Sequence, residues 1–269
     1  MSEIRALQPN ATIARLLLGA HLERLRLSRG LTQKAVADRV YISVSKLCRI
    51  EAGCHRSAIE DVQRLAHLYE ASDDVGELLL SRAVAAQGRG TYHSFADVAD
   101  AALRDYLDVE AAGLTFIYAP HVIPAVLRTR CYARELLGEV SEQEADRRLW
   151  LLSLRQQRFF RARKAPVRIL LGELAHDGRI GDASVMREQW AHLKAAAVDL
   201  RVLPARQAAR SYALGAFSKA VLGNNEMTVT CAEHPSGELR LRPDSHERAT
   251  AQFEVLWQRA GRGSLRVAA

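Results

Sequence analysis

The sequence is poor in the features that define several large classes of protein. It has four cysteines, none in a Cys-x-x-Cys pair, which excludes a disulfide-stabilised scaffold and argues against the common zinc sites. No stretch approaches the roughly eighteen consecutive apolar residues of a membrane-spanning helix, and the N-terminus lacks the apolar core of a secretory signal. Gly-x-Ser-x-Gly, His-Glu-x-x-His and Walker motifs are also missing. We therefore expect a soluble cytoplasmic protein that is not an enzyme and needs no metal or cofactor.

The charge balance gives a first indication of the partner. The 269 residues include 38 Lys or Arg against 31 Asp or Glu, a net charge of +7. Such a balance is compatible with a polyanionic partner. Only five of the basic residues are lysines. Arginine suits phosphate and guanine, but a GC-rich genome produces the same bias, and both explanations stay open.

The pattern of apolar residues divides the chain near residue 90. Residues 11–86 indicate short helices, and residues 87–90 (Gln-Gly-Arg-Gly) are typical of a linker. We expect a helical domain over 1–86, a linker over 87–91 and an α+β domain with a mixed or antiparallel sheet over 92–269. Apolar, β-branched runs in the second domain predict strands at 167–171, 200–203, 217–222, 227–231 and 239–241. Asp244 is the expected cap of a last helix that continues through Phe253 and Trp257.

The strongest local signals lie in residues 16–53. A first helix carries Leu18, Leu22, Leu25 and Leu27 and stops at Gly30. Thr32 is the expected N-cap of a second helix, and Ser43 that of a third. On the third helix Leu47 and Ile50 point inward, and Gly53 ends it. This predicts two short helices joined by a tight turn.

Residues 31–53 resemble the helix-turn-helix of the Cro/phage-repressor (XRE) family. The resemblance is carried by Thr32-Gln33, by Ile42-Ser43 and by Glu51-x-Gly53, and it extends over residues 16–70. The family usually has glycine where this chain has Tyr41. Either Tyr41 adopts a left-handed conformation, with a strain of about 1–2 kcal/mol, or the turn is slightly remodelled.

The resemblance implies a role for each matching residue. The third helix enters the major groove, and the base-reading positions fall on Val44, Ser45 and Arg49. Arg26 pairs with Glu51 to tie the first helix to the third. Contacts with DNA phosphates fall on Gln33, Ser43 and Lys46, and Arg56, just past Gly53, is a further candidate from its position. Cys48 and Cys54 beside His55 fit no common ligand spacing, although metal or redox sensing is an alternative.

The second domain resembles the DUF5753 (Scr1-associated) domain of actinobacterial regulators. The resemblance covers most of residues 92–260, but 92–95 (Tyr-His-Ser-Phe) replace tryptophans typical of that family. The matching positions are Tyr118, Pro120, Ile123, Pro124, Leu127, Thr129, Tyr132 and Ala133, then 186–189, Leu193, 202–204, Gly215 and Phe217.

Three features of this domain leave alternatives open. Tyr118, Pro124 and Tyr132 form a possible pocket, or the tyrosines are core residues with hydroxyls at its edge. Glu173 and His176 share a helical face without a nucleophile or third ligand. The helix around Trp150 carries an arginine run that is either a solvated face or a contact for DNA or an acidic protein. The basic residues of that run are Arg147, Arg148, Arg155, Arg158, Arg161, Arg163, Lys164 and Arg168.

These features predict a sequence-specific DNA-binding transcriptional regulator, acting as a homodimer with an effector or partner-binding domain. The family resemblance implies a small acidic partner protein. The alternative is a protein-binding module of a toxin–antitoxin-like system, or a helix-turn-helix fused to an enzyme. No membrane partner is expected.

Overall fold

The computed structural model describes residues 10–162, 166–208, 215–223, 225–233, 239–242 and 246–260. The described residues form two compact units, one of 10–94 with 222, 223 and 225–227, and one of the described residues within 95–221 and 228–260. We call residues 10–94 the head and the second unit the body. Within the described residues, no helix has the length and hydropathy needed to cross a membrane.

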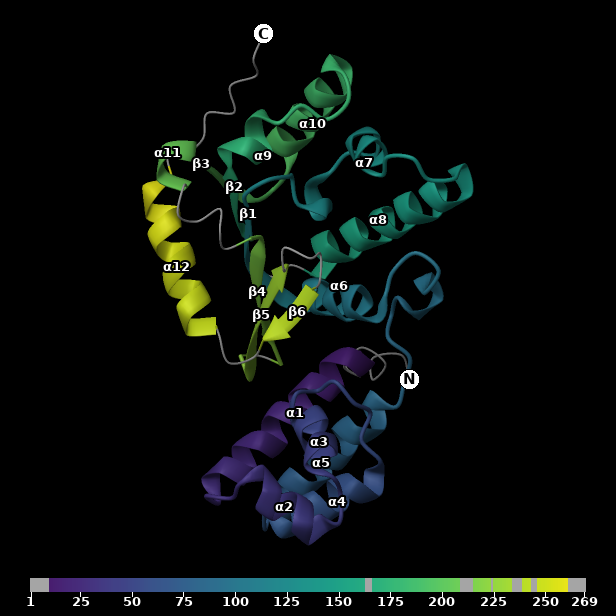
Figure 1. The fold of residues 1–269 in the computed structure, drawn as a ribbon, viewed down its shortest axis with the longest axis vertical. Coiled ribbons are helices and arrows are strands. Elements are labelled where there is room, and N and C mark those ends of the chain that lie inside the picture. Colours follow the sequence, from purple (N-terminus) through teal and green to yellow (C-terminus); the bar gives the residue numbers. More distant parts are fainter. Residues whose placement is uncertain are drawn as a thin grey trace, which may run out of the picture. The chain divides into compact units, whose positions relative to one another are not determined.

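The head consists of helices, as the sequence predicts (Figure 1). Leu18, Leu22, Leu47 and Leu65 meet in its core. Leu27, expected on the same face, is 59% exposed, because it follows Leu25 by two residues and points to the other side of the helix. The helices are α1 (Ala11–Ser28), α2 (Gln33–Val40), α3 (Val44–Glu51), α4 (Ile59–Leu68) and α5 (Asp73–Ala86).

The predicted linker is part of the head. The Gln87 side-chain amide donates to the Ser57 carbonyl at 2.7 Å, and the Asn10 amide donates to the Thr91 hydroxyl at 2.5 Å. Tyr92 is buried. These contacts hold the segment on the helices, so the first unit extends to Ser94 instead of ending at residue 86.

The body is built on a six-stranded mixed sheet with the order β3-β2-β1-β4-β5-β6. Neighbours β1–β2 and β2–β3 are parallel, whereas β1–β4 and β5–β6 are antiparallel. Five of the strands lie where the sequence predicts them. The central strand β1 was not among the predicted runs, although its residues, Leu-Thr-Phe-Ile-Tyr-Ala, are typical of a buried strand. The strands are β1 (Leu114–Ala119), β2 (Arg168–Gly172), β3 (Asp199–Leu203), β4 (Phe217–Leu222), β5 (Met227–Glu233) and β6 (Leu239–Arg242).

Helices lie on both sides of this sheet. On one side is α12, whose Phe253 stacks on Phe116 of β1 with ring centroids 3.9 Å apart, while α6 and α8 lie on the other side (Figure 1). The predicted last helix is present, but its expected cap, Asp244, is outside the described residues. The body helices are α6 (Ala101–Gly113), α7 (Arg130–Leu136), α8 (Glu142–Ala162), α9 (Glu173–Asp177), α10 (Ala183–Ala195), α11 (Ala205–Ala208) and α12 (His246–Arg259). Single 3-10 turns, η2 (His93–Phe95) and η3 (Ala125–Leu127), precede α6 and α7.

Candidate DNA-binding surface

Helix α3 presents one buried and one exposed side. Leu47 and Ile50 are at most 1% exposed and belong to the core of the head. The other side carries Val44, which is 42% exposed, together with the exposed Ser45 and Arg49. All three predicted base-reading side chains therefore face solvent on one short helix, a valine, a hydroxyl and a guanidinium that can each contact a base edge.

Side-chain hydroxyls cap the starts of α2 and α3. The Ser43 hydroxyl accepts from the backbone N–H of Lys46 at 3.1 Å, and the Thr32 hydroxyl accepts from Ala35 N–H at the start of α2. Both predicted N-caps are thus formed. Ser43 is exposed, so its hydroxyl can still donate to a phosphate.

A buried charge cluster ties α3 to α1 and α2. The Arg26 guanidinium donates to both carboxylate oxygens of Glu51, at 2.7 and 3.0 Å, and the Gln33 amide donates to the same carboxylate at 2.8 Å. The hydrogen bond to Glu51 raises the pKa of Arg26. Side chains of Arg26 and Glu51 are 8% and 3% exposed, so this is a buried bidentate pair. It is the pair that the family resemblance implies.

This cluster depends on a close approach of α1 to the end of α3. A Cβ atom on Gly19 would lie 2.4 Å from the Glu51 carbonyl oxygen, closer than any real contact. Gly19 therefore lets the two backbones meet, and the meeting brings Arg26 within reach of Glu51. One hydrogen of the Gln33 amide bonds to Glu51, and the amide carries a second hydrogen that can donate.

A second charge cluster holds the first half of α3. The Lys46 ammonium lies 2.5 Å from one oxygen of Asp61, a side chain that is 2% exposed, and Arg64 lies 2.5 Å from the other oxygen. Arg64 also donates to the Val40 carbonyl at 3.0 Å. Lys46, predicted to bind a phosphate, is thus paired within the head in the free protein. The sequence carries no local signal for this, because Asp61 lies on α4.

The other predicted residues around α3 are exposed. Arg56 is exposed in the segment after α3, where it can reach a phosphate. Cys48 and Cys54 are free thiols on the surface. Tyr41 adopts the left-handed conformation, with φ 57° and ψ 45°, and is 88% exposed. The strain expected from its sequence position, about 1–2 kcal/mol, is therefore present in the fold.

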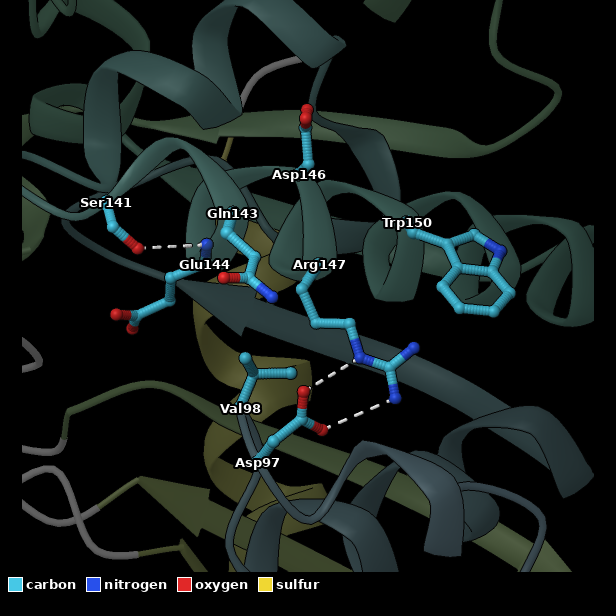
Figure 2. Close-up of a pocket in the computed structure, with 8 residues that line it drawn as sticks. All are labelled: Asp97, Val98, Ser141, Gln143, Glu144, Asp146, Arg147 and Trp150. Carbon is cyan, nitrogen blue, oxygen red and sulfur yellow. Dashed lines mark hydrogen bonds and ion pairs between the residues drawn. The ribbon is translucent and has the colours of Figure 1, made fainter.

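The body has an open groove at the start of α8, of about 680 Å³ (Figure 2). Arg147 pairs with Asp97 at 2.8 Å and lies 4.3 Å from the Phe95 ring centroid and 4.9 Å from that of Trp150. The hydrogen bond from Arg147 lowers the pKa of Asp97. Trp150 remains 57% exposed. The lining residues are Asp97, Val98, Ser141, Gln143, Glu144, Asp146, Arg147 and Trp150.

The tyrosines of the predicted pocket are part of the core and do not line this groove. Tyr118 and Tyr132 are at most 1% exposed, and burial raises the pKa of Tyr132. Pro124 directly precedes the turn η3 in the passage from β1 to α7. Gln189 of α10, fully buried, accepts from Thr129 N–H at 2.8 Å and donates to the Leu127 carbonyl at 2.7 Å. The shared sequence motif therefore encodes the packing of this passage.

Most of the described arginines in the predicted run form ion pairs inside the body. Besides Arg147, they are Arg148 with Glu144, Arg155 with Glu110 and Arg168 with Glu254. Glu110 is only 2% exposed. Arg158 and Arg161 are exposed, and Arg163 and Lys164 lie outside the described residues. Arg155 thus joins α8 to α6, Arg168 joins β2 to α12, and Arg147 joins α8 to the segment before α6, whereas the Arg148 pair lies within α8.

Glu173 and His176 have separate partners. Glu173 accepts a hydrogen bond from the backbone N–H of Ala205, and the His176 ring lies 4.5 Å from the Trp190 ring, centroid to centroid. Both contacts join α9 to adjacent elements. Glu173 and His176, whose spacing most resembles a catalytic pair in this sequence, therefore have a packing role.

Together, a capped short helix with an exposed polar side and a tight turn before it define a helix-turn-helix protein. A family model described as a helix-turn-helix domain matches residues 17–79. A second model, described as a domain of unknown function (DUF5753), matches residues 103–264. Because this match spans more than half of the chain, the protein belongs to the DUF5753 family. No curated protein and no solved structure matches the chain.

Proposed function

We propose that this protein is a sequence-specific DNA-binding regulator of transcription that reads the major groove with α3. The observation that carries the proposal is the exposed side of α3, with Val44, Ser45 and Arg49 free of the core. Arg49 forms two hydrogen bonds with guanine, and Val44 contacts a thymine methyl group. Ser45 tolerates several bases. Gln33, Ser43 and Arg56 hold phosphates and set the register.

The test is selection of duplexes from a random-sequence library with the full chain, followed by footprinting on the promoter of its own gene. A regulator enriches one motif, and its affinity falls steeply as salt rises. Absence of an enriched motif, with binding insensitive to salt, would remove the proposal. The same motif tests the proposed homodimer, because two heads on a two-fold axis select half-sites about one helical turn apart.

A second candidate is a partner-binding module, which the body groove favours. Trp150 is a large aromatic side chain exposed beside polar groups, a composition typical of binding surfaces. The arginine run gives little support to the acidic partner expected from the sequence. Four arginines of the run already pair with carboxylates of the body. In this second candidate function the protein pairs with a partner in a toxin–antitoxin-like system. Both candidate functions place the protein in the cytoplasm, and neither assigns it a catalytic step.

A further inference from the structure

Tyr41 occupies the turn between α2 and α3 in a conformation that is unfavourable for an aromatic residue. Its φ of 57° lies in the left-handed region. Glycine reaches this region without cost, and asparagine tolerates it, whereas a Cβ and a bulky ring make it strained. A tyrosine here therefore lowers the stability of the turn relative to either of those residues.

Contacts within the head do not offset this strain. The side chain is 88% exposed, so little of its ring is in contact with the rest of the described chain. The turn is closed by the backbone N–H of Tyr41, which bonds to the Ala37 carbonyl whatever the side chain is. Strained residues cluster at functional sites, where the side chain makes contacts that offset the strain. Because the Tyr41 side chain is exposed, such contacts would be with a partner outside the head.

The position of Tyr41 identifies that partner. Two residues later Ser43 caps α3, and Val44, the first residue of α3, is 42% exposed. Tyr41 thus borders the end of α3 that enters the major groove. A phenol suits the edge of the groove, because its ring packs on deoxyribose and its hydroxyl donates to a phosphate oxygen.

We infer that Tyr41 is a DNA-contacting residue, with its ring on the sugar–phosphate backbone beside the α3 site and its hydroxyl on a phosphate. The inference rests on the proposed function. The resembled family usually has glycine at this position, and glycine has no side chain that could make this contact. The strain of the left-handed Tyr41 is offset by contacts that form only when the protein binds DNA.

The test compares full-chain Tyr41→Asn and Tyr41→Phe with the wild type. Asparagine relieves the strain, so hydrogen exchange of the α2 and α3 peptides slows about fivefold. The same variant loses the contact, and its affinity for a labelled mixed-sequence duplex falls about five- to tenfold. Tyr41→Phe keeps the ring and loses the smaller part of the affinity. Because tyrosine is neutral, the salt dependence of binding is the same in all three proteins.

The outcomes separate the two claims. A more stable Tyr41→Asn that binds the duplex as tightly as wild type would overturn the inference and leave the proposed function intact. A weaker Tyr41→Asn with faster exchange would also overturn it, because the side chain would then be supporting the fold. A wild-type chain that binds no duplex at low salt would overturn the proposed function itself.

Discussion

Removing the Glu51 carboxylate is the most direct test of how the head positions α3. Glu51→Ala leaves the Arg26 guanidinium, 8% exposed, with the Leu31 carbonyl at 2.9 Å and the distant carboxylate of Glu23 at 3.8 Å. Breaking a buried ion pair by removing one partner costs about 3–5 kcal/mol. Gln33 loses its acceptor in the same variant. A domain of this size has about 5–15 kcal/mol of stability, so the loss is a large part of it.

Hydrogen exchange of the α1–α3 peptides in the full chain measures this loss locally. A loss of 3 kcal/mol accelerates exchange by about a hundredfold or more. Glu23→Ala is the matched control, because it removes the weak, half-exposed partner of the same arginine and costs about 0.5 kcal/mol or less. The double variant Arg26→Met with Glu51→Leu removes both charges and recovers most of the stability. If Glu51→Ala changes exchange no more than Glu23→Ala does, the buried pair does not support the fold.

Three further predictions concern single side chains. Arg49→Ala costs about 1–3 kcal/mol of binding and relaxes base preference at one position of each half-site in a selection experiment; equal weakening on all sequences would make Arg49 a phosphate contact. Lys46→Ala removes one of the two cations on buried Asp61, so it destabilises the head by about 1–3 kcal/mol and leaves the salt slope unchanged; a slope reduced by about 0.9 would give Lys46 the phosphate role instead. Arg147→Ala raises the pKa of Asp97 towards its usual value in a carboxyl NMR titration, while Asp182, whose pKa is lowered by Ser184 and backbone N–H groups, does not change. Because the Asp97 pKa is lowered in the fold, its contribution to stability is present above the unfolded pKa and is lost as pH falls through the folded one; identical Asp97 titrations in both proteins would contradict this.

The sequence predicts the parts of the head that depend on neighbouring residues. Thr32 and Ser43 act as caps through hydrogen bonds to N–H groups three residues away, so the signal and the structure share one short window. At Tyr41 the family resemblance left two outcomes open, a left-handed residue or a remodelled turn, and the structure has the left-handed residue. Arg26 and Glu51 are distant in sequence, and only the family resemblance brought them together.

What the sequence did not predict depends on contacts between distant elements. Lys46 is indistinguishable from a solvent-facing lysine until α4 brings Asp61 against it. In the body, the sequence left a pocket and a core position open for Tyr118 and Tyr132. Tyr118 packs against Phe217 in the cluster that includes Phe253 of α12, and Tyr132 is buried on α7, so both belong to the core. The half-exposed ring of Trp150 lies against Phe95 and Arg147, a contact with a segment some fifty residues earlier that the sequence around Trp150 does not indicate.

The two charge clusters explain how so short a helix is held in a fixed direction, as the proposed recognition role requires. At eight residues, α3 is too short to be stable alone, and its direction is set by what holds it. Lys46 attaches its first half to α4 through Asp61, and Glu51 attaches its end to α1 and α2. Both carboxylates are buried and both contacts are with other helices, so α3 is fixed at two points. Of the side chains proposed to read bases, Arg49 lies between these points, and Val44 and Ser45 directly precede the first. Changes at either cluster should therefore reduce stability before they alter base preference, whereas changes at Arg49 should do the reverse.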